Sequence, residues 1–329
     1  MTDHVDTPPL HSFTRAGLTF EVVDGGPRDG EVVVLLHGFP EDATAWAAVS
    51  ERLHDKGFRT LAPDQRGYSP AASPVGNDAY RVSELVRDVL ALVDASGTDR
   101  VHLVGHDWGG AVAWATALSA PDRLLSLTVL STPHPAAMER AMRTPDQARR
   151  SWYMLAFQVP GLPERVLSRS MLRFLTSAGL PADHAQRYAA RFATRASLRG
   201  PIGWYRASAP WRSLTSGGLG SRKAAGGRGA AARSAGSTNG AAAQRSSQVQ
   251  VPTTYVWGRR DVALGRAAAE ATAALVDADY RFVELDAGHW LPECNPDDVA
   301  DAITDRARGG RGTHDWHAGS AALGPDPRR

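Results

Sequence analysis

The sequence predicts an α/β fold with a mostly parallel central sheet that is covered by helices on both faces. Apolar segments of strand length alternate with amphipathic segments of helix length along most of the chain. Strands of a parallel sheet are buried on both faces, so they read as continuous apolar runs, as residues 31–36 (EVVVLL) do. Residues 133–212 break this alternation with several helical patterns and no convincing strand. We therefore expect a core of alternating strands and helices, interrupted by a helical insertion.

The elements of the core follow one another in a regular order. Apolar runs bounded by turn residues predict strands at residues 18–24, 31–36, 58–64, 100–107, 124–132, 252–258 and 280–286. Apolar residues at helical spacing predict a helix around Trp46 that ends at Gly57, and further helices at 83–97, 111–120, 266–276 and 296–307.

Composition divides the chain into five segments. Residues 1–132 and 251–308 are the two parts of the core, and residues 133–212 are a helical cap. Residues 213–250 contain no acidic and no aromatic residue and almost no large apolar side chain. Such a segment cannot bury enough surface to offset its ordering entropy, so we expect a disordered insertion there. The tail, residues 309–329, is expected to be disordered as well.

The bulk properties restrict the range of partners. The chain has 329 residues and a formal net charge of only +2, so its overall charge does not favour nucleic acid or a membrane as a partner. Its single cysteine, Cys294, excludes an intrachain disulfide and fits a reducing compartment. We find neither a signal-peptide pattern nor an apolar run long enough to span a bilayer. The expected location is therefore cytoplasmic, without membrane insertion.

The strongest local motif is GHDWGG, residues 105–110, between an expected strand and an expected helix. A tight turn of the form G-x-nucleophile-x-G presents its central side chain beside the N–H groups of a helix N-terminus. Asp107 occupies the position that Ser holds in esterases and lipases. We interpret Asp107 as a nucleophile; the alternative is an ordinary surface aspartate. Its neighbour His106 is expected to be structural.

A second motif, HGFP at residues 37–40, directly follows the strand at 31–36. A turn there can aim the N–H of Phe39 at the nucleophile, and the N–H of Trp108 would complete an oxyanion hole. On its own, HGFP is equally compatible with a plain turn at the end of a strand.

Two further motifs follow later strands: WGRRD, residues 257–261, and GHW, residues 288–290. The carboxyl ends of parallel strands meet at one edge of a sheet, where catalytic loops gather. The chain order of nucleophile, acid and histidine predicts that Asp261 orients His289 and that His289 is the general base. A lone histidine after a strand is more often structural, but the combination favours catalysis.

Together these motifs resemble the epoxide hydrolase branch of the α/β-hydrolase family. The similarity covers residues from about 15 to 212 and from 251 to 305. Its specific elements are HGFP, DQRGYSP (64–70), GHDWGG, AGHW (287–290) and two cap segments, WYMLAFQVPG (152–161) and GWYRASAPW (203–211). The resemblance implies the α/β-hydrolase fold, an epoxide and water as reactants, and no metal or other cofactor.

The resemblance also implies roles for residues of the cap. Each of the two cap segments contributes one tyrosine to the epoxide oxygen, and the matching positions are Tyr153 and Tyr205. The aromatic residues of these segments suggest an apolar pocket. We expect the pocket to be lined by His37, Pro40, Trp152, Phe157, Trp204 and Trp290.

The residue types fit this chemistry. An epoxide is attacked at saturated carbon, so a serine nucleophile would form an ether that water cannot hydrolyse. Attack by Asp107 would form an ester, whose carbonyl a water activated by His289 can reach. The departing alkoxide needs a proton, and a tyrosine hydroxyl is a neutral donor at pH 7.

Other functions use similar residues. A haloalkane or haloacid dehalogenase also has an aspartate nucleophile and could use the Trp108 indole N–H to bind halide, but it needs no tyrosine donors. A plain esterase would require a serine nucleophile. The alternative outside enzymes is a ligand-binding pseudoenzyme, or a chain disabled by the insertion at residues 213–250.

Overall fold

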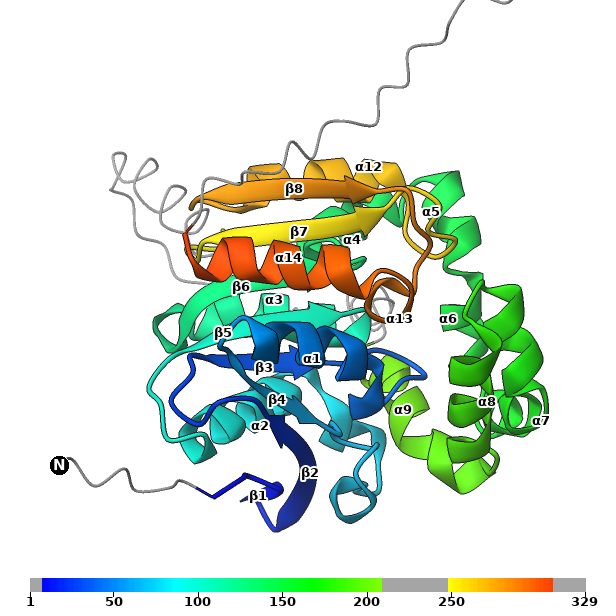
Figure 1. Ribbon diagram of the computed structural model, residues 1–329. Coiled ribbons are helices and arrows are strands. Elements are labelled where there is room, and N and C mark those ends of the chain that lie inside the picture. The colour runs from blue at the N-terminus through cyan, green and yellow to red at the C-terminus, as the bar shows by residue number, and fades with distance from the viewer. Residues whose placement is uncertain (1–7, 209–247, 310–329) are drawn as a thin grey trace, which may run out of the picture.

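The structure, a computed structural model, describes residues 8–208 and 248–309. Its centre is an eight-stranded sheet in the order β1-β2-β4-β3-β5-β6-β7-β8 (Figure 1). The strands are β1 (Ser12–Arg15), β2 (Leu18–Gly25), β3 (Val32–Leu36), β4 (Arg59–Pro63), β5 (Val101–His106), β6 (Leu124–Leu130), β7 (Thr253–Gly258) and β8 (Tyr280–Leu285). From β4 to β8 every neighbouring pair is parallel, whereas β1 with β2 and β2 with β4 are antiparallel. The predicted fold class is confirmed.

Helices cover both faces of the sheet. On one face lie α1 (Ala47–Asp55) and α14 (Pro296–Ala307), and on the other lie α2 (Val82–Ala95) and α3 (Trp108–Ser119) (Figure 1). Strands β3 and β5 are buried along their whole length, as expected for a parallel sheet between two helical layers. Helix α2 buries its predicted apolar face, and each such aliphatic side chain contributes about 1.5–3 kcal/mol.

Short helices complete the loops of the core. They are η1 (Ala43–Trp46), η2 (Pro70–Ala72), η3 (Asn77–Tyr80), η4 (Pro121–Arg123), α12 (Arg266–Ala271), η5 (Ala273–Leu275) and α13 (Leu291–Cys294). The helix predicted at 266–276 was therefore too long. Val276 already has extended backbone and forms a parallel bridge with Val249, so the helix ends before it.

Strand β1 was not predicted. It has only four residues, and just one of them, Phe13, is buried. Phe13 stacks on Phe20 of β2 with ring centroids 4.7 Å apart. A short edge strand of mixed polarity has no clear alternation, so only its pairing with β2 defines it.

Six helices occupy the described residues between β6 and β7. They are α4 (Pro135–Ala141), α5 (Pro145–Arg150), α6 (Trp152–Ala156), α7 (Leu162–Ser177), α8 (Ala182–Arg191) and α9 (Arg195–Ala207). In Figure 1, α6 to α9 lie beyond the tips of the strand arrows, over the carboxyl edge of the sheet. This placement puts helical side chains opposite the loops that follow β3, β5, β7 and β8.

The expected insertion at residues 213–250 lies outside the described residues except for 248–250, and the expected tail lies outside them except for Gly309. Residues 248–250 correct the predicted boundary. Val249 is fully buried, and its N–H donates to the carbonyl of Leu275 at 3.0 Å. Because the residues around Val249 are polar, the sequence does not indicate that its side chain is buried in the core. Across residues 8–208 and 248–309, no helix combines the length and the apolar character needed to cross a bilayer.

Candidate active site

Asp107 lies between β5 and α3 in a strained turn. Its backbone has φ 48° and ψ −118°, a region that L-residues rarely adopt. The turn fits because its surroundings lack side chains: a Cβ at Gly38 would overlap the Asp107 side chain, and a Cβ at Gly109 would overlap the carbonyl of Leu36. The hydroxyl of Thr132 donates to the Asp107 carbonyl at 2.7 Å. These contacts hold the carboxylate above the carboxyl edge of the sheet.

Asp107, Asp261 and His289 meet at this edge although they follow three different strands. The Nε2 atom of His289 lies 3.6 Å from Oδ2 of Asp107, and Nδ1 lies 2.8 Å from Oδ2 of Asp261. The other oxygen of Asp261 accepts the N–H groups of Ala263 and Leu264, at 2.7 and 3.0 Å. Asp261 is therefore fixed on both oxygens, and it sets the orientation of the imidazole.

The electrostatics of the group favour a charged resting state. Burial alone would raise the pKa of Asp107, but the interaction with His289 outweighs it and lowers that pKa below its ordinary value. Burial alone would lower the pKa of His289, but the charges of Asp261 and Asp107 raise it well above its ordinary value. At neutral pH an imidazolium therefore lies between two carboxylates.

The two backbone N–H groups predicted to form an oxyanion hole lie beside Asp107. The N–H of Phe39 donates to Oδ1 of Asp107 at 2.8 Å. Trp108 is the first residue of α3, so its N–H is one of the helix groups without a partner inside the helix. Two backbone N–H groups on this side can stabilise an oxygen that becomes negative.

Tyr153 of α6 and Tyr205 of α9 come together opposite Asp107. Their ring centroids are 6.1 Å apart, and the Tyr205 ring lies 5.0 Å from that of Trp108 and 5.4 Å from that of Phe39. Phe157 fills the space between these rings, 4.8 Å from Tyr205. Burial, with a further effect of the Asp107 charge, raises the pKa of both tyrosines well above the ordinary value. Both hydroxyls therefore stay protonated at neutral pH.

Two residues expected in the pocket wall lie elsewhere. Trp152 has 66% of its surface exposed, because it is next to Tyr153 on α6 and points to the other side of that helix. His37 is fully buried below the site, where Nδ1 contacts the Gly38 carbonyl at 2.9 Å and Nε2 accepts the N–H of Gln65 at 3.2 Å. Its position in the HGFP motif indicated proximity to the site but not the direction of the ring.

The other expected wall residues are buried. Pro40 lies in the turn after β3. Trp290 packs on His289, with ring centroids 5.3 Å apart, and its indole N–H donates to the Ala178 carbonyl at 2.9 Å. Trp204 donates in the same way to the carbonyl of Arg66 at 2.9 Å. Each of these two tryptophans thus joins the helical segment to the core.

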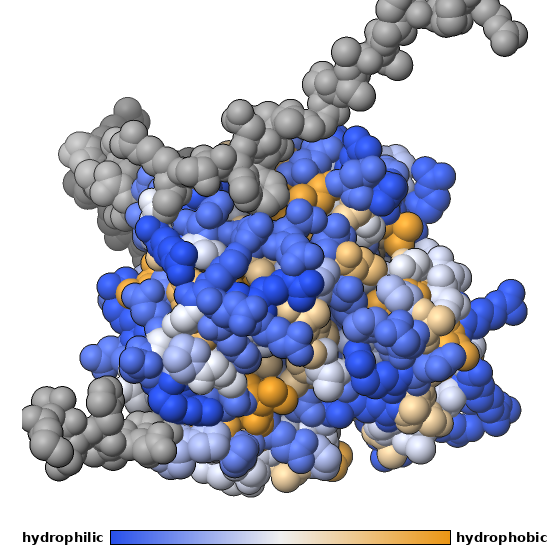
Figure 2. Space-filling model, viewed as in Figure 1, coloured by the Kyte–Doolittle hydropathy of each residue, from blue (hydrophilic) through white to orange (hydrophobic). Residues whose placement is uncertain are grey.

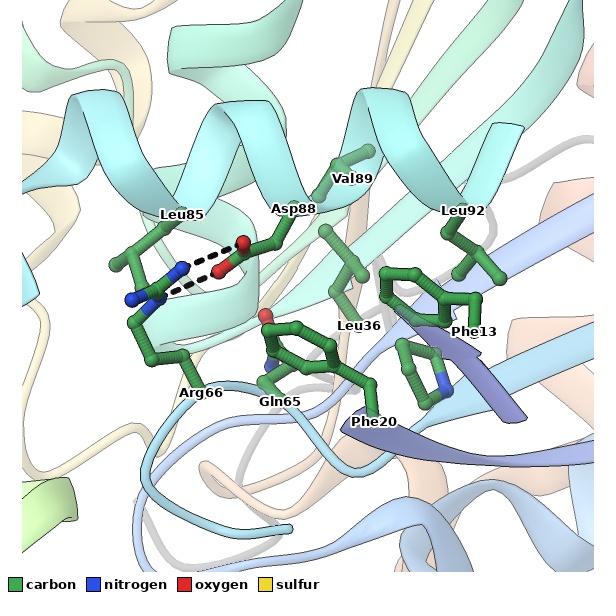
Figure 3. Close-up of a pocket in the computed structure, with 10 residues that line it drawn as sticks. Phe13, Phe20, Leu36, Gln65, Arg66, Leu85, Asp88, Val89 and Leu92 are labelled. Carbon is green, nitrogen blue, oxygen red and sulfur yellow. Dashed lines mark hydrogen bonds and ion pairs between the residues drawn. The ribbon is translucent and has the colours of Figure 1, made fainter. Parts of the chain in front are cut away.

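Arg66 is in turn fixed from the core side. Its guanidinium forms two hydrogen bonds to Asp88 of α2, at 2.6 and 2.7 Å. Figure 3 shows this pair at the edge of a small cleft between α2 and the β1–β2 hairpin. None of the predicted site residues lines this cleft. A continuous chain of contacts therefore runs from Asp88 through Arg66 and Trp204 to Tyr205.

Sequence reasoning missed a buried polar network behind His289. Nδ1 of His106 lies 2.8 Å from Oε1 of Glu41, and Nε2 of His106 contacts the carbonyl oxygen of His289 at 2.9 Å. Burial would lower the pKa of His106, but the charge of Glu41 raises it. The other oxygen of Glu41 accepts the N–H of Gly38 at 2.6 Å. Glu41 directly follows the HGFP motif and His106 lies within GHDWGG, yet nothing in their spacing indicates that they meet.

Glu293 extends this network. Its Oε1 accepts the hydroxyl of Tyr188 at 3.0 Å, and its Oε2 is buried without a partner among the described residues. Burial, together with the charge of Glu41, raises the pKa of Glu293 to about 8. Glu293 is therefore mostly uncharged at neutral pH.

Comparison with known proteins agrees with this architecture. The family model described as "alpha/beta hydrolase fold" matches residues 31–296. The AB hydrolase superfamily protein YfhM of Bacillus subtilis is 32% identical over 85% of this chain and 91% of its own length. Epoxide hydrolase A of Mycobacterium tuberculosis is 31% identical over 87% of this chain and 93% of its own length.

Solved structures give the same result. The crystal structure of Epoxide Hydrolase A from Mycobacterium thermoresistibile superposes with a TM-score of 0.71 at 28% identity, over 91% of this chain and 97% of that one. With its sheet order, its family match and these relatives, the chain belongs to the α/β-hydrolase family and, within it, to the family of the epoxide hydrolases.

Proposed function

We propose that this hydrolase converts an epoxide to a vicinal diol in two steps, with Asp107 as the nucleophile. The observation that carries the proposal is the pair of protonated tyrosines, Tyr153 and Tyr205, opposite a charged Asp107. A carboxylate on one side and hydroxyl donors on the other match the two ends of the C–O bond that breaks. The similarity to proteins named epoxide hydrolase supports the same substrate class.

In the first step, Oδ2 of Asp107 attacks a ring carbon and forms a C–O ester bond while the C–O bond of the epoxide breaks. The epoxide oxygen takes a proton from the tyrosine pair. General-acid assistance of this kind is typically worth about 10²–10⁴-fold. Phe39, Phe157 and Trp108 surround the reacting atoms with apolar surface, which strengthens the hydrogen bonds.

The His289 imidazolium supplies the proton that completes this step. Formation of the ester removes the negative charge of Asp107, which is one cause of the raised pKa. The imidazolium then releases its proton more readily, and that proton restores the tyrosine hydroxyl. His289 becomes a neutral base only after the ester exists.

In the second step, His289 takes a proton from a water molecule, and the hydroxide adds to the ester carbonyl of Asp107. The N–H groups of Phe39 and Trp108 stabilise the oxyanion, at about 2.7–4 kcal/mol for one such donor. Collapse of the intermediate breaks the ester C–O bond, and the departing alkoxide takes the proton of the added hydroxyl group. This releases the diol and leaves the Asp107 carboxylate beside the His289 imidazolium. Asp261 orients the imidazole in both steps.

The test is a panel of aryl and alkyl epoxides and haloalkanes, assayed for diol and for halide. We expect diol from epoxides and little halide, because a halide leaves without a proton and gains nothing from the tyrosines. Halide release faster than diol formation would replace this proposal with dehalogenation. The proposal needs no metal or other cofactor, and the cytoplasmic location expected from the composition stays a prediction.

A further inference from the structure

The outer side of α6 and α7 exposes large apolar side chains. Trp152 and Leu155 of α6 are 66% and 60% exposed, and Leu162 and Val166 of α7 are 53% and 51% exposed. Helix α7 buries its opposite side through Leu167, Met171 and Leu175. Figure 2 shows hydrophobic residues among hydrophilic ones on the right of the molecule, where Figure 1 places these helices. Large apolar side chains exposed on successive turns of α7 and on the preceding α6 make this side a candidate interaction surface.

The same side of α7 is basic. Arg165, Arg169 and Arg173 follow at four-residue spacing and are exposed between the apolar side chains. The only acidic residue of α7, Glu164, is buried and paired with Arg206. Within residues 135–207 the chain has twelve arginines against four acidic residues, although the formal net charge of the whole chain is only +2. We call the surface formed by Trp152, Leu155, Leu162, Val166 and these three arginines the α6–α7 face.

We propose that the α6–α7 face docks on the surface of an anionic lipid bilayer. Apolar side chains with tryptophan among them enter the boundary between headgroups and acyl chains, while arginines at the same level bind the anionic headgroups. This is binding in the plane of the interface and requires no spanning helix. The inference goes beyond the proposed chemistry and does not depend on it.

Charge and apolar character together select the lipid surface. Two copies of the chain meeting through this face would bring arginine against arginine, with no exposed acidic residue of α7 to compensate. A nucleic acid would contact the arginines but leave the exposed leucines and Val166 without apolar partners. An anionic bilayer satisfies both sets of side chains.

In this docked orientation, α6 would face the bilayer. Trp152 on the outer side and Tyr153 on the inner side are consecutive residues of that helix. Epoxides that partition into the acyl region would then be concentrated next to the helix that holds Tyr153.

The experiment is co-sedimentation of the full chain with vesicles of phosphatidylcholine alone or mixed with phosphatidylglycerol. We expect binding only to the anionic vesicles, and weaker binding at high salt because surface charges are screened. The triple variant Arg165→Gln, Arg169→Gln, Arg173→Gln should bind roughly 100-fold more weakly. The double variant Trp152→Ser, Leu155→Ser should lose roughly tenfold or more, because it removes the apolar contribution.

A matched control changes the net charge by the same amount elsewhere. Arg81, Arg87 and Arg123 lie on the core, and their simultaneous replacement by Gln should leave vesicle binding unchanged. Melting temperature and circular dichroism show whether each variant is folded. Equal loss of binding in the control and the α7 variant would overturn the proposal, as would absence of wild-type binding. A wild-type dimer that the serine variant dissociates, without any vesicle binding, would show that a second copy covers the face.

Discussion

The Nε2 atom of His289 lies 3.6 Å from Oδ2 of Asp107, too far for a good hydrogen bond but close enough for strong charge interaction. The imidazole is instead held through Nδ1 by Asp261 at 2.8 Å. Asp107 thus keeps Oδ2 available for attack, while its charge still controls the protonation of His289. The first three predictions follow from this arrangement and from the tyrosines opposite it.

Removal of the base should trap the covalent intermediate. A His289→Gln variant should still form the ester on Asp107 but hydrolyse it very slowly, so intact-protein mass spectrometry should show the added mass of the epoxide. The Asp107→Asn variant is the control and should show no early adduct. An unmodified His289→Gln variant, under conditions where the wild type turns over, would contradict the two-step mechanism.

The tyrosine pair should be partly redundant. Tyr153 and Tyr205 lie next to each other opposite Asp107, so either hydroxyl can donate to the epoxide oxygen. Each single substitution by Phe should therefore reduce ring opening without abolishing it. The double variant should lose about 10²–10⁴-fold in that step, while ester hydrolysis should change far less. Rapid-quench measurement of both steps separates these effects. Near wild-type ring opening in the double variant would assign both tyrosines to packing alone.

The apparent pKa of His289 should differ between resting enzyme and ester. In the resting state the charges of Asp261 and Asp107 raise the pKa of His289 well above its ordinary value. In the ester the charge of Asp107 is absent, so hydrolysis should reach its full rate at a lower pH than the resting pKa predicts. Comparison of resting-enzyme NMR titration with the pH profile of single-turnover hydrolysis checks this. Identical values would mean that Asp107 does not control His289.

Glu293 should make stability depend on pH. Its folded pKa of about 8 lies above the ordinary value of 4.5, so the unfolded chain releases this proton first. The uncharged form favours folding, and stability should therefore fall as pH rises from about 4.5 to 8. Glu293→Gln keeps the shape and removes the titration, so its melting temperature should exceed that of the wild type at pH 8 by roughly 2–4 °C for each kcal/mol regained. A difference in melting temperature between wild type and Glu293→Gln that is the same at pH 5 and at pH 8 would contradict this prediction.

The contact between Trp204 and Arg66 should position Tyr205. Trp204→Phe leaves the buried Arg66 carbonyl without its donor, which costs about 1–3 kcal/mol, and loosens the helix next to Tyr205. We expect a lower melting temperature and slower ring opening, with ester hydrolysis little changed. Trp152→Phe is the matched control, because most of the Trp152 side chain is exposed. Equal effects of the two substitutions would remove the positioning role.

The fold class could be predicted from the sequence because its signals are local. Short apolar runs rich in β-branched residues and bounded by turn residues, such as residues 31–36, favour strands buried on both faces, and the glycines around Asp107 are required by a tight turn. Parallel pairing then brings the ends of β5, β7 and β8 to one edge. The chain order of the three motifs, together with parallel pairing, therefore predicted that Asp107, Asp261 and His289 lie at the same edge.

Tertiary structure decided what depends on side-chain direction and on distant neighbours. Trp152 and Tyr153 are adjacent in sequence, yet one faces solvent and the other faces Asp107, since consecutive helical residues point about 100° apart and only packing selects the inner side. Glu41 and His106 are 65 positions apart and look like ordinary loop and motif residues, but the fold buries them as a pair. Direction and burial of this kind arise from contacts between segments, which no local pattern records.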